Sequence, residues 1–144
     1  MIKIINIFSF LLLTTFLHAQ TEEAATPVKG DLDITINVPN APSDKGKILY
    51  ALYTEKNFLG DPVLSSAAKI KDGKSTTRFN GVSAGTYAVI IFHDSNDNGK
   101  LDMDEYGMPK ENFALSNNPR SMGPPQFQNA KFTLDKSMAL EIKL

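Results

Sequence analysis

Alternating apolar and polar residues are the strongest signal in the middle of this chain, and they predict β-strands. Between residues 31 and 38 every second side chain is apolar, namely Leu32, Ile34, Ile36 and Val38. A period of two is typical of a strand with one face on the core and one toward solvent. The runs 47–53 and 86–93 are apolar on both faces. They therefore indicate strands in the middle of a sheet.

Shorter runs extend this pattern. Residues 75–79 are typical of a further strand, and residues 67–71 of either a short strand or the tail of a helical turn. Residues 128–134 and 138–144 are expected to form a hairpin. No segment keeps a helical period over about 11 residues. The sequence thus predicts an all-β fold, an antiparallel immunoglobulin-like or transthyretin-like β-sandwich of about six to seven strands with one long calcium-binding loop.

The first residues have a different composition. Residues 1–19 contain one positive charge, Lys3, then an apolar run, and they end at the small residue Ala19. This order is typical of a cleaved signal peptide. The run is shorter than the roughly 20 residues of a membrane-spanning helix, so no transmembrane segment is expected after cleavage. We expect residues 20–29 to be a flexible lead-in, residues 30–144 to form the β-sandwich domain, and the protein to be periplasmic or secreted.

Composition excludes several classes of function. The chain has 15 Lys and Arg against 16 Asp and Glu, no cysteine and two histidines. A net charge of −1 argues against binding of nucleic acid. The lack of cysteine excludes disulfides and thiolate metal sites. Loss of residues 1–19 would leave His93 as the single histidine. One imidazole cannot build a multi-histidine metal site, so we expect this ring to bond a loop carbonyl, with a functional role as the alternative.

Residues 94–105 match the twelve-residue calcium-loop pattern. Calcium prefers about six to eight oxygen ligands, and a tightly curled loop turns alternate residues inward. Gly99 permits the sharp turn at its centre. A plain Asn-Gly hairpin turn and a site for another cation are the alternatives. The expected ligands are the side chains of Asp94, Asn96, Asn98, Asp102 and Glu105 with the main-chain carbonyl of Lys100.

The charge of this ligand set bears on its affinity. Three carboxylates and two neutral amides follow a strand rather than a helix, so the loop is not a paired EF-hand. Modest charge in an unpaired loop is typical of weak extracellular sites, with a Kd of about 10⁻⁴–10⁻³ M. We therefore expect a structural ion that orders the loop, because calcium is always abundant outside the cell.

Four segments together resemble a bacterial family of exported proteins known as domain of unknown function 2141. These are residues 85–89, 92–102, 107–111 and 116–118. The resemblance covers about residues 30–144 and implies a small secreted or periplasmic β-sandwich with no assigned catalytic residues. Residues 112–115 depart from it, since Asn-Phe-Ala-Leu stands where glycine and a bulky aromatic residue are expected. The loop is also similar to calcium loops in B-type repeats of bacterial surface adhesins.

The expected function follows from these points. We expect an exported, non-catalytic binding or structural module of the cell envelope that holds one structural Ca²⁺. Its partners would be the calcium ion and an envelope protein or glycan. The alternative is a secreted hydrolase or carbohydrate-active protein that uses acidic residues. A hydrolase should show a concave pocket in which two carboxylates converge away from the loop.

Overall fold

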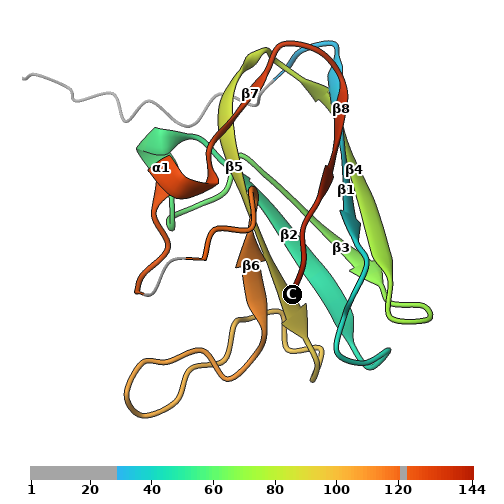
Figure 1. Cartoon of the computed structure of the whole chain (residues 1–144), viewed down its shortest axis with the longest axis vertical. Coiled ribbons are helices and arrows are strands. Elements are labelled where there is room, and N and C mark those ends of the chain that lie inside the picture. Colours follow the sequence, from blue (N-terminus) through green and yellow to red (C-terminus); the bar gives the residue numbers. More distant parts are fainter. Residues whose placement is uncertain (1–28, 121–122) are drawn as a thin grey trace, which may run out of the picture.

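Two β-sheets with a shared apolar interior make up the computed structural model, which describes residues 29–120 and 123–144 (Figure 1). The fold is a β-sandwich, as the sequence predicts. The expected signal peptide 1–19 and residues 20–28 of the expected lead-in lie outside the described residues. Within the described ranges, no helix is both long and apolar enough to cross a membrane.

The smaller sheet has three strands in the order β4-β1-β8, which are β1 (Leu32–Val38), β4 (Ser75–Val82) and β8 (Met138–Glu141). The larger sheet has the order β3-β2-β5-β6, and β7 also pairs with β5. Its strands are β2 (Lys47–Tyr53), β3 (Leu64–Lys69), β5 (Gly85–Asp94), β6 (Phe113–Leu115) and β7 (Phe132–Leu134). Two short helices, η1 (Glu55–Asn57) and α1 (Phe127–Ala130), complete the structure. All strand pairs are antiparallel except β1 with β8.

The predicted alternation sets the core. In β1 and β2 every second side chain is buried between the sheets, namely Ile34, Ile36, Val38, Ile48, Tyr50 and Leu52. Strand β5 lies between β2 and β6 and buries both faces, which confirms the central strand predicted at 86–93. Val89 and Ile91 face the main core, whereas Ala88 packs in a second cluster with Phe127 of α1. This cluster anchors the segment that follows β6.

Two expectations about the second half of the chain were wrong. The predicted hairpin of 128–134 with 138–144 does not form, because β7 pairs with β5 and β8 pairs with β1 in the opposite sheet. This crossing lets Leu134 and Ile142 both be fully buried in the main core. Residues 127–130 form α1 instead of the start of a strand. Strand β6 is an additional strand, at a position where the sequence predicts none.

Candidate cation-binding loop

The predicted loop begins where β5 ends and returns to the same sheet as β6, and Figure 1 shows it at one end of the sandwich. Asp94 is the last residue of β5, and its side chain is fully buried. One carboxylate oxygen accepts the backbone N–H of Asn98 at 3.0 Å, and the other accepts that of Gly99 at 2.9 Å. These hydrogen bonds curl the loop around Asp94.

A lysine from the neighbouring strand compensates the buried charge. The register of β2 on β5 places Lys47 opposite Asp94. Its ammonium lies 3.3 Å from Asp94 Oδ2 and 3.0 Å from Oδ1 of the exposed Asp97. The hydrogen bond with Asp97 raises the pKa of Lys47, and the bond with Asp94 adds to this while desolvation opposes it. Sequence spacing does not predict the role of Lys47, because its contact with Asp94 depends on strand pairing between distant segments.

A second carboxylate gathers the two asparagines of the loop. Asp102 accepts the side-chain amide of Asn96 at 2.7 Å and that of Asn98 at 3.0 and 3.1 Å. The amide oxygen of Asn96 in turn accepts the Asn98 N–H at 3.1 Å. A chain of hydrogen bonds therefore brings together four of the six predicted ligands, which are Asp94, Asn96, Asn98 and Asp102.

The other two predicted ligands are placed differently. Lys100 is exposed, and its main-chain N–H donates to the side-chain oxygen of Asn98 at 2.8 Å. Glu105 is exposed as well, and its side chain makes no hydrogen bond or ion pair with any residue of 29–120 or 123–144. The structure thus does not bring the Glu105 carboxylate to the other four side chains.

Glu111, which lies outside the twelve-residue pattern, holds the loop backbone instead. Its Oε1 accepts both the N–H and the hydroxyl of Ser95, at 2.9 and 3.1 Å, and its Oε2 accepts the Asp102 N–H at 3.3 Å. A small backbone turn brings Glu111 back to this position, since Lys110 N–H bonds the Asp102 carbonyl at 2.8 Å. In the sequence, residues 107–111 stand out only as part of the family resemblance.

The expectation for His93 is confirmed. The residue is 4% exposed, and its Nε2 lies 2.7 Å from the carbonyl oxygen of Lys45. The imidazole therefore fixes the turn before β2 against the end of β5. This contact holds Lys47 and Asp94 in the same region of the fold.

The donor set of the loop is rich in oxygen but modest in charge. Among the described residues, no group of three or more His, Cys, Asp or Glu side chains could hold a metal ion. The predicted set relies on amide and main-chain oxygens in addition to its carboxylates, and calcium accepts both kinds of ligand. In this structure the oxygens of Asp94 and Asp102 are engaged by N–H groups and by Lys47. The loop is thus rich in hydrogen-bond acceptors. A cation would have to displace the N–H groups and the Lys47 ammonium from these oxygens in order to bind them.

Comparison with known proteins gives one match. The family model described as "Uncharacterized protein conserved in bacteria (DUF2141)" matches residues 36–141. No curated protein matches the chain, and no solved structure matches it. The matched range begins within β1 and ends with β8, so it spans both sheets and the whole loop. The chain therefore belongs to this uncharacterized bacterial family, DUF2141.

Proposed function

We propose that this protein is exported and serves as a non-catalytic binding or structural module of the cell envelope, in which one Ca²⁺ stabilises the loop after β5. The observation that carries the proposal is the gathering of Asp94, Asn96, Asn98 and Asp102 at the end of a central strand. These residues also have the spacing of a calcium loop. Each side chain offers an oxygen that a hard cation prefers.

Binding would rearrange the side chains rather than the backbone. An amide group that turns by half a rotation presents its oxygen where its nitrogen was, so Asn96 and Asn98 can change from donors to ligands. The Lys100 carbonyl would add a main-chain oxygen, as position 7 of such loops does. The Lys47 ammonium already sits on Asp94 and would oppose the ion. This competition favours the weak range of Kd, about 10⁻⁴–10⁻³ M.

Calcium is expected to raise the melting temperature of the purified full chain. At about 10 mM, calcium would be tenfold to a hundredfold above this Kd, which corresponds to about 1.4–2.7 kcal/mol of stabilisation. Such a gain shifts Tm by several degrees in a domain of this size. The measurement is thermal unfolding with calcium, with equimolar magnesium as the control for ionic strength. Equal melting temperatures in the two salts would refute the calcium site.

A matched pair of variants tests which glutamate closes the site. The spacing assigns the last ligand to Glu105, whereas Glu111 contacts the loop backbone. We expect Glu105→Gln to lose part of the calcium response and to leave stability without calcium unchanged. We expect Glu111→Gln to lower stability by about 1 kcal/mol with and without calcium, because its amide accepts the backbone N–H groups less strongly. The reverse pattern would make Glu111 the ligand.

The described cavities do not support the hydrolase alternative. Four of them are lined by residues of the ranges 29–120 and 123–144, and Glu111 is the single carboxylate among those lining residues. Its two oxygens already hold the backbone of the loop. A pair of converging carboxylates, which acid–base hydrolysis of a glycosidic bond requires, is therefore not found in these cavities.

A further inference from the structure

Three dipeptides in the sequence consist of asparagine or aspartate followed by glycine, and the structure describes all of them. They are Asp72–Gly73, Asn80–Gly81 and Asn98–Gly99. Such dipeptides are chemically labile, because glycine has no side chain to hinder its backbone nitrogen from attacking the preceding side chain. The attack forms a cyclic imide, which water then opens. Each dipeptide is therefore a candidate site of covalent modification.

An aspartate carboxylate accepts the glycine N–H in all three dipeptides. The distances from nitrogen to oxygen are 2.8 Å for Gly73 with Asp44, 3.3 Å for Gly81 with Asp33 and 2.9 Å for Gly99 with Asp94. A carboxylate is far too weak a base to remove an amide proton, and its negative charge opposes the loss of that proton. The hydrogen bond also holds the nitrogen in place. These contacts therefore slow the attack by the glycine nitrogen.

Gly99 has fewer backbone restraints than the other two glycines. The carbonyls of Gly73 and Gly81 each accept an N–H from another segment of the chain, at 2.8 and 2.6 Å. The bond to Asp94 is the single hydrogen bond of the Gly99 backbone among the described residues. Apart from its neighbours in the chain, no atom lies within 4 Å of the Cβ position of Gly99. Opening one hydrogen bond is therefore enough to free its nitrogen.

The side chain of Asn98 is placed for this attack. Its Oδ1 accepts the Lys100 N–H at 2.8 Å. A donor at this oxygen stabilises the negative charge that develops on it when the carbon is attacked. Asn98 is also exposed, so water reaches it. The loop therefore activates Asn98 Cγ and, through Asp94, restrains the nitrogen that would attack it.

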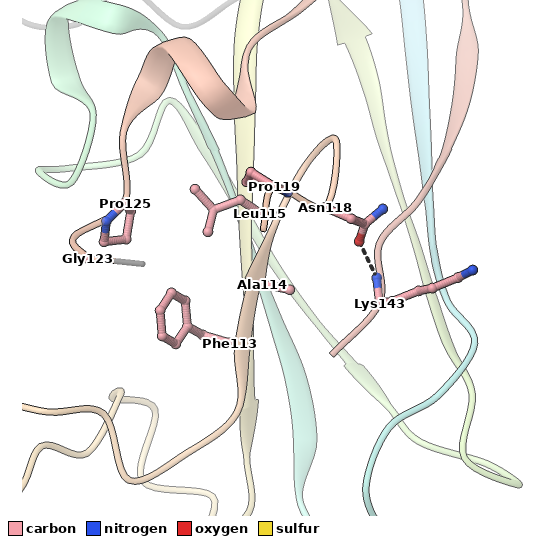
Figure 2. A pocket seen from close by; sticks show the side chains of 8 residues that line it. All are labelled: Phe113, Ala114, Leu115, Asn118, Pro119, Gly123, Pro125 and Lys143. Atoms are coloured by element: carbon pink, nitrogen blue, oxygen red, sulfur yellow. Dashed lines mark hydrogen bonds between the residues drawn. The ribbon is translucent and has the colours of Figure 1, made fainter. Parts of the chain in front are cut away.

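Asn118 is an exposed asparagine without this chemistry. It lines a cavity beside β6, and Figure 2 shows its side-chain oxygen bonded to the Lys143 N–H, at 2.7 Å. The next residue is Pro119, whose backbone nitrogen carries no proton to lose. Asn118 therefore cannot form the imide by the same attack. The residue that follows the asparagine, and not exposure alone, distinguishes Asn98.

We propose that Asn98 is a deamidation site of the folded chain and that Asp94 controls its rate as a positioning residue. When the hydrogen bond to Asp94 opens, the Gly99 nitrogen loses its proton to water and bonds to Asn98 Cγ. The bond from Cγ to Nδ2 breaks, and the nitrogen takes a proton from water and leaves as ammonia. Water then opens the imide at either carbonyl, which leaves aspartate or isoaspartate at position 98. The net reaction consumes water and releases ammonia.

Deamidation would change the contacts of the loop as well as its charge. The Asn98 amide donates to both oxygens of Asp102, at 3.0 and 3.1 Å. A carboxylate at position 98 has no hydrogen to donate and repels Asp102 at this distance. The Asn98→Asp protein is therefore expected to melt at a lower temperature than the wild type in calcium-free buffer. The proposal uses contacts that form without an ion, so it does not depend on the calcium site.

The test follows deamidation of the full chain in mildly alkaline, calcium-free buffer by peptide mass spectrometry, with chromatography to separate aspartate from isoaspartate. Conversion of Asn98 is expected to be at least about tenfold slower in the native protein than in urea, because a charge-assisted hydrogen bond must open first. Asp94→Ala should remove most of this protection, and Asp94→Asn, which keeps an acceptor oxygen, should remove part of it. Asp97→Ala removes an exposed carboxylate of the same loop and should have no effect. Asn80 in β4 is the internal reference and should stay protected in all three variants.

Several results would overturn the proposal. One is an equal rate at Asn98 in the native protein and in urea. Another is equal acceleration at Asn98 and Asn80 in both Asp94 variants, which would assign the protection to the whole fold. Conversion to aspartate without isoaspartate would mean direct hydrolysis of the side chain and no attack by Gly99. An Asn98→Asp protein as stable as the wild type would refute the expected effect on the loop.

Discussion

Replacing Asp94 with alanine is expected to lower the free energy of unfolding by about 3 kcal/mol or more. The side chain is fully buried and accepts two backbone N–H groups, from Asn98 and Gly99. A hydrogen bond to a charged group contributes about 1.5–3 kcal/mol, and alanine would leave both donors unsatisfied. Lys47 would lose its buried partner as well. Urea unfolding followed by circular dichroism measures this change.

A neighbouring aspartate is the matched control. Asp97 bonds the same ammonium at 3.0 Å, but its side chain is 62% exposed. Asp97→Ala is therefore expected to change stability by less than about 1 kcal/mol. Asp94→Asn should be intermediate, since the amide keeps one acceptor oxygen. Equal stabilities of the Asp94→Ala and Asp97→Ala proteins would contradict the role of Asp94 as the centre of the loop.

The Asp94→Ala variant also distinguishes the structural role of this side chain from its proposed role as a calcium ligand. The hydrogen bonds around its carboxylate act in the absence of an ion, so the loss of stability is expected without calcium. The proposed site needs the same carboxylate at position 1, so Asp94→Ala should also abolish any rise of Tm with calcium. If the Asp94→Ala protein is destabilised but its Tm still rises with calcium, Asp94 stabilises the loop but is not a calcium ligand.

Local patterns predicted the strands better than their pairing. Alternation at Ile34 and Ile36, and the apolar run 86–93, reflect burial of each strand's own side chains. Which strand lies beside which depends on contacts between distant segments. Residues 132–134 and 138–141 therefore have the sequence of a hairpin, although they lie in opposite sheets. The short strand β6 was not predicted for the same reason. Its three residues lie in a polar stretch and form a strand only because they pair with β5.

The same distinction between local and distant contacts applies to the candidate site. Asp94, Asn96, Asn98 and Asp102 are close in sequence, so spacing alone predicted that they gather. Lys47 reaches Asp94 through the register of β2 on β5, a contact between residues far apart in the chain. Glu111 returns to the loop only because a small turn forms after Asp102. A pattern confined to twelve residues does not reach either partner.

Gly46 is expected to be as sensitive as Asp94, although it lies outside the loop. It precedes β2 and has a backbone φ of +71°, a conformation that favours glycine. A Cβ at this position would lie 1.9 Å from the carbonyl oxygen of Asp94 and 2.9 Å from Ser95 Cα. Both neighbours are backbone atoms, so neither can turn aside as a side chain would. Gly46→Ala is therefore expected to cost about 3 kcal/mol or more in unfolding free energy.

Gly107→Ala is the control that measures the conformational part of this effect without the steric part. Gly107 has nearly the same φ, +75°, but nothing lies within 4 Å of its Cβ position. Its substitution should cost only about 1–2 kcal/mol, the conformational penalty alone. Urea unfolding of the two variants under one condition gives the difference, which measures how closely the turn before β2 presses on the end of β5. If Gly46→Ala were no more destabilising than Gly107→Ala, the two backbones would not be in contact. The positions of Lys47 and His93 beside Asp94 would then need another explanation.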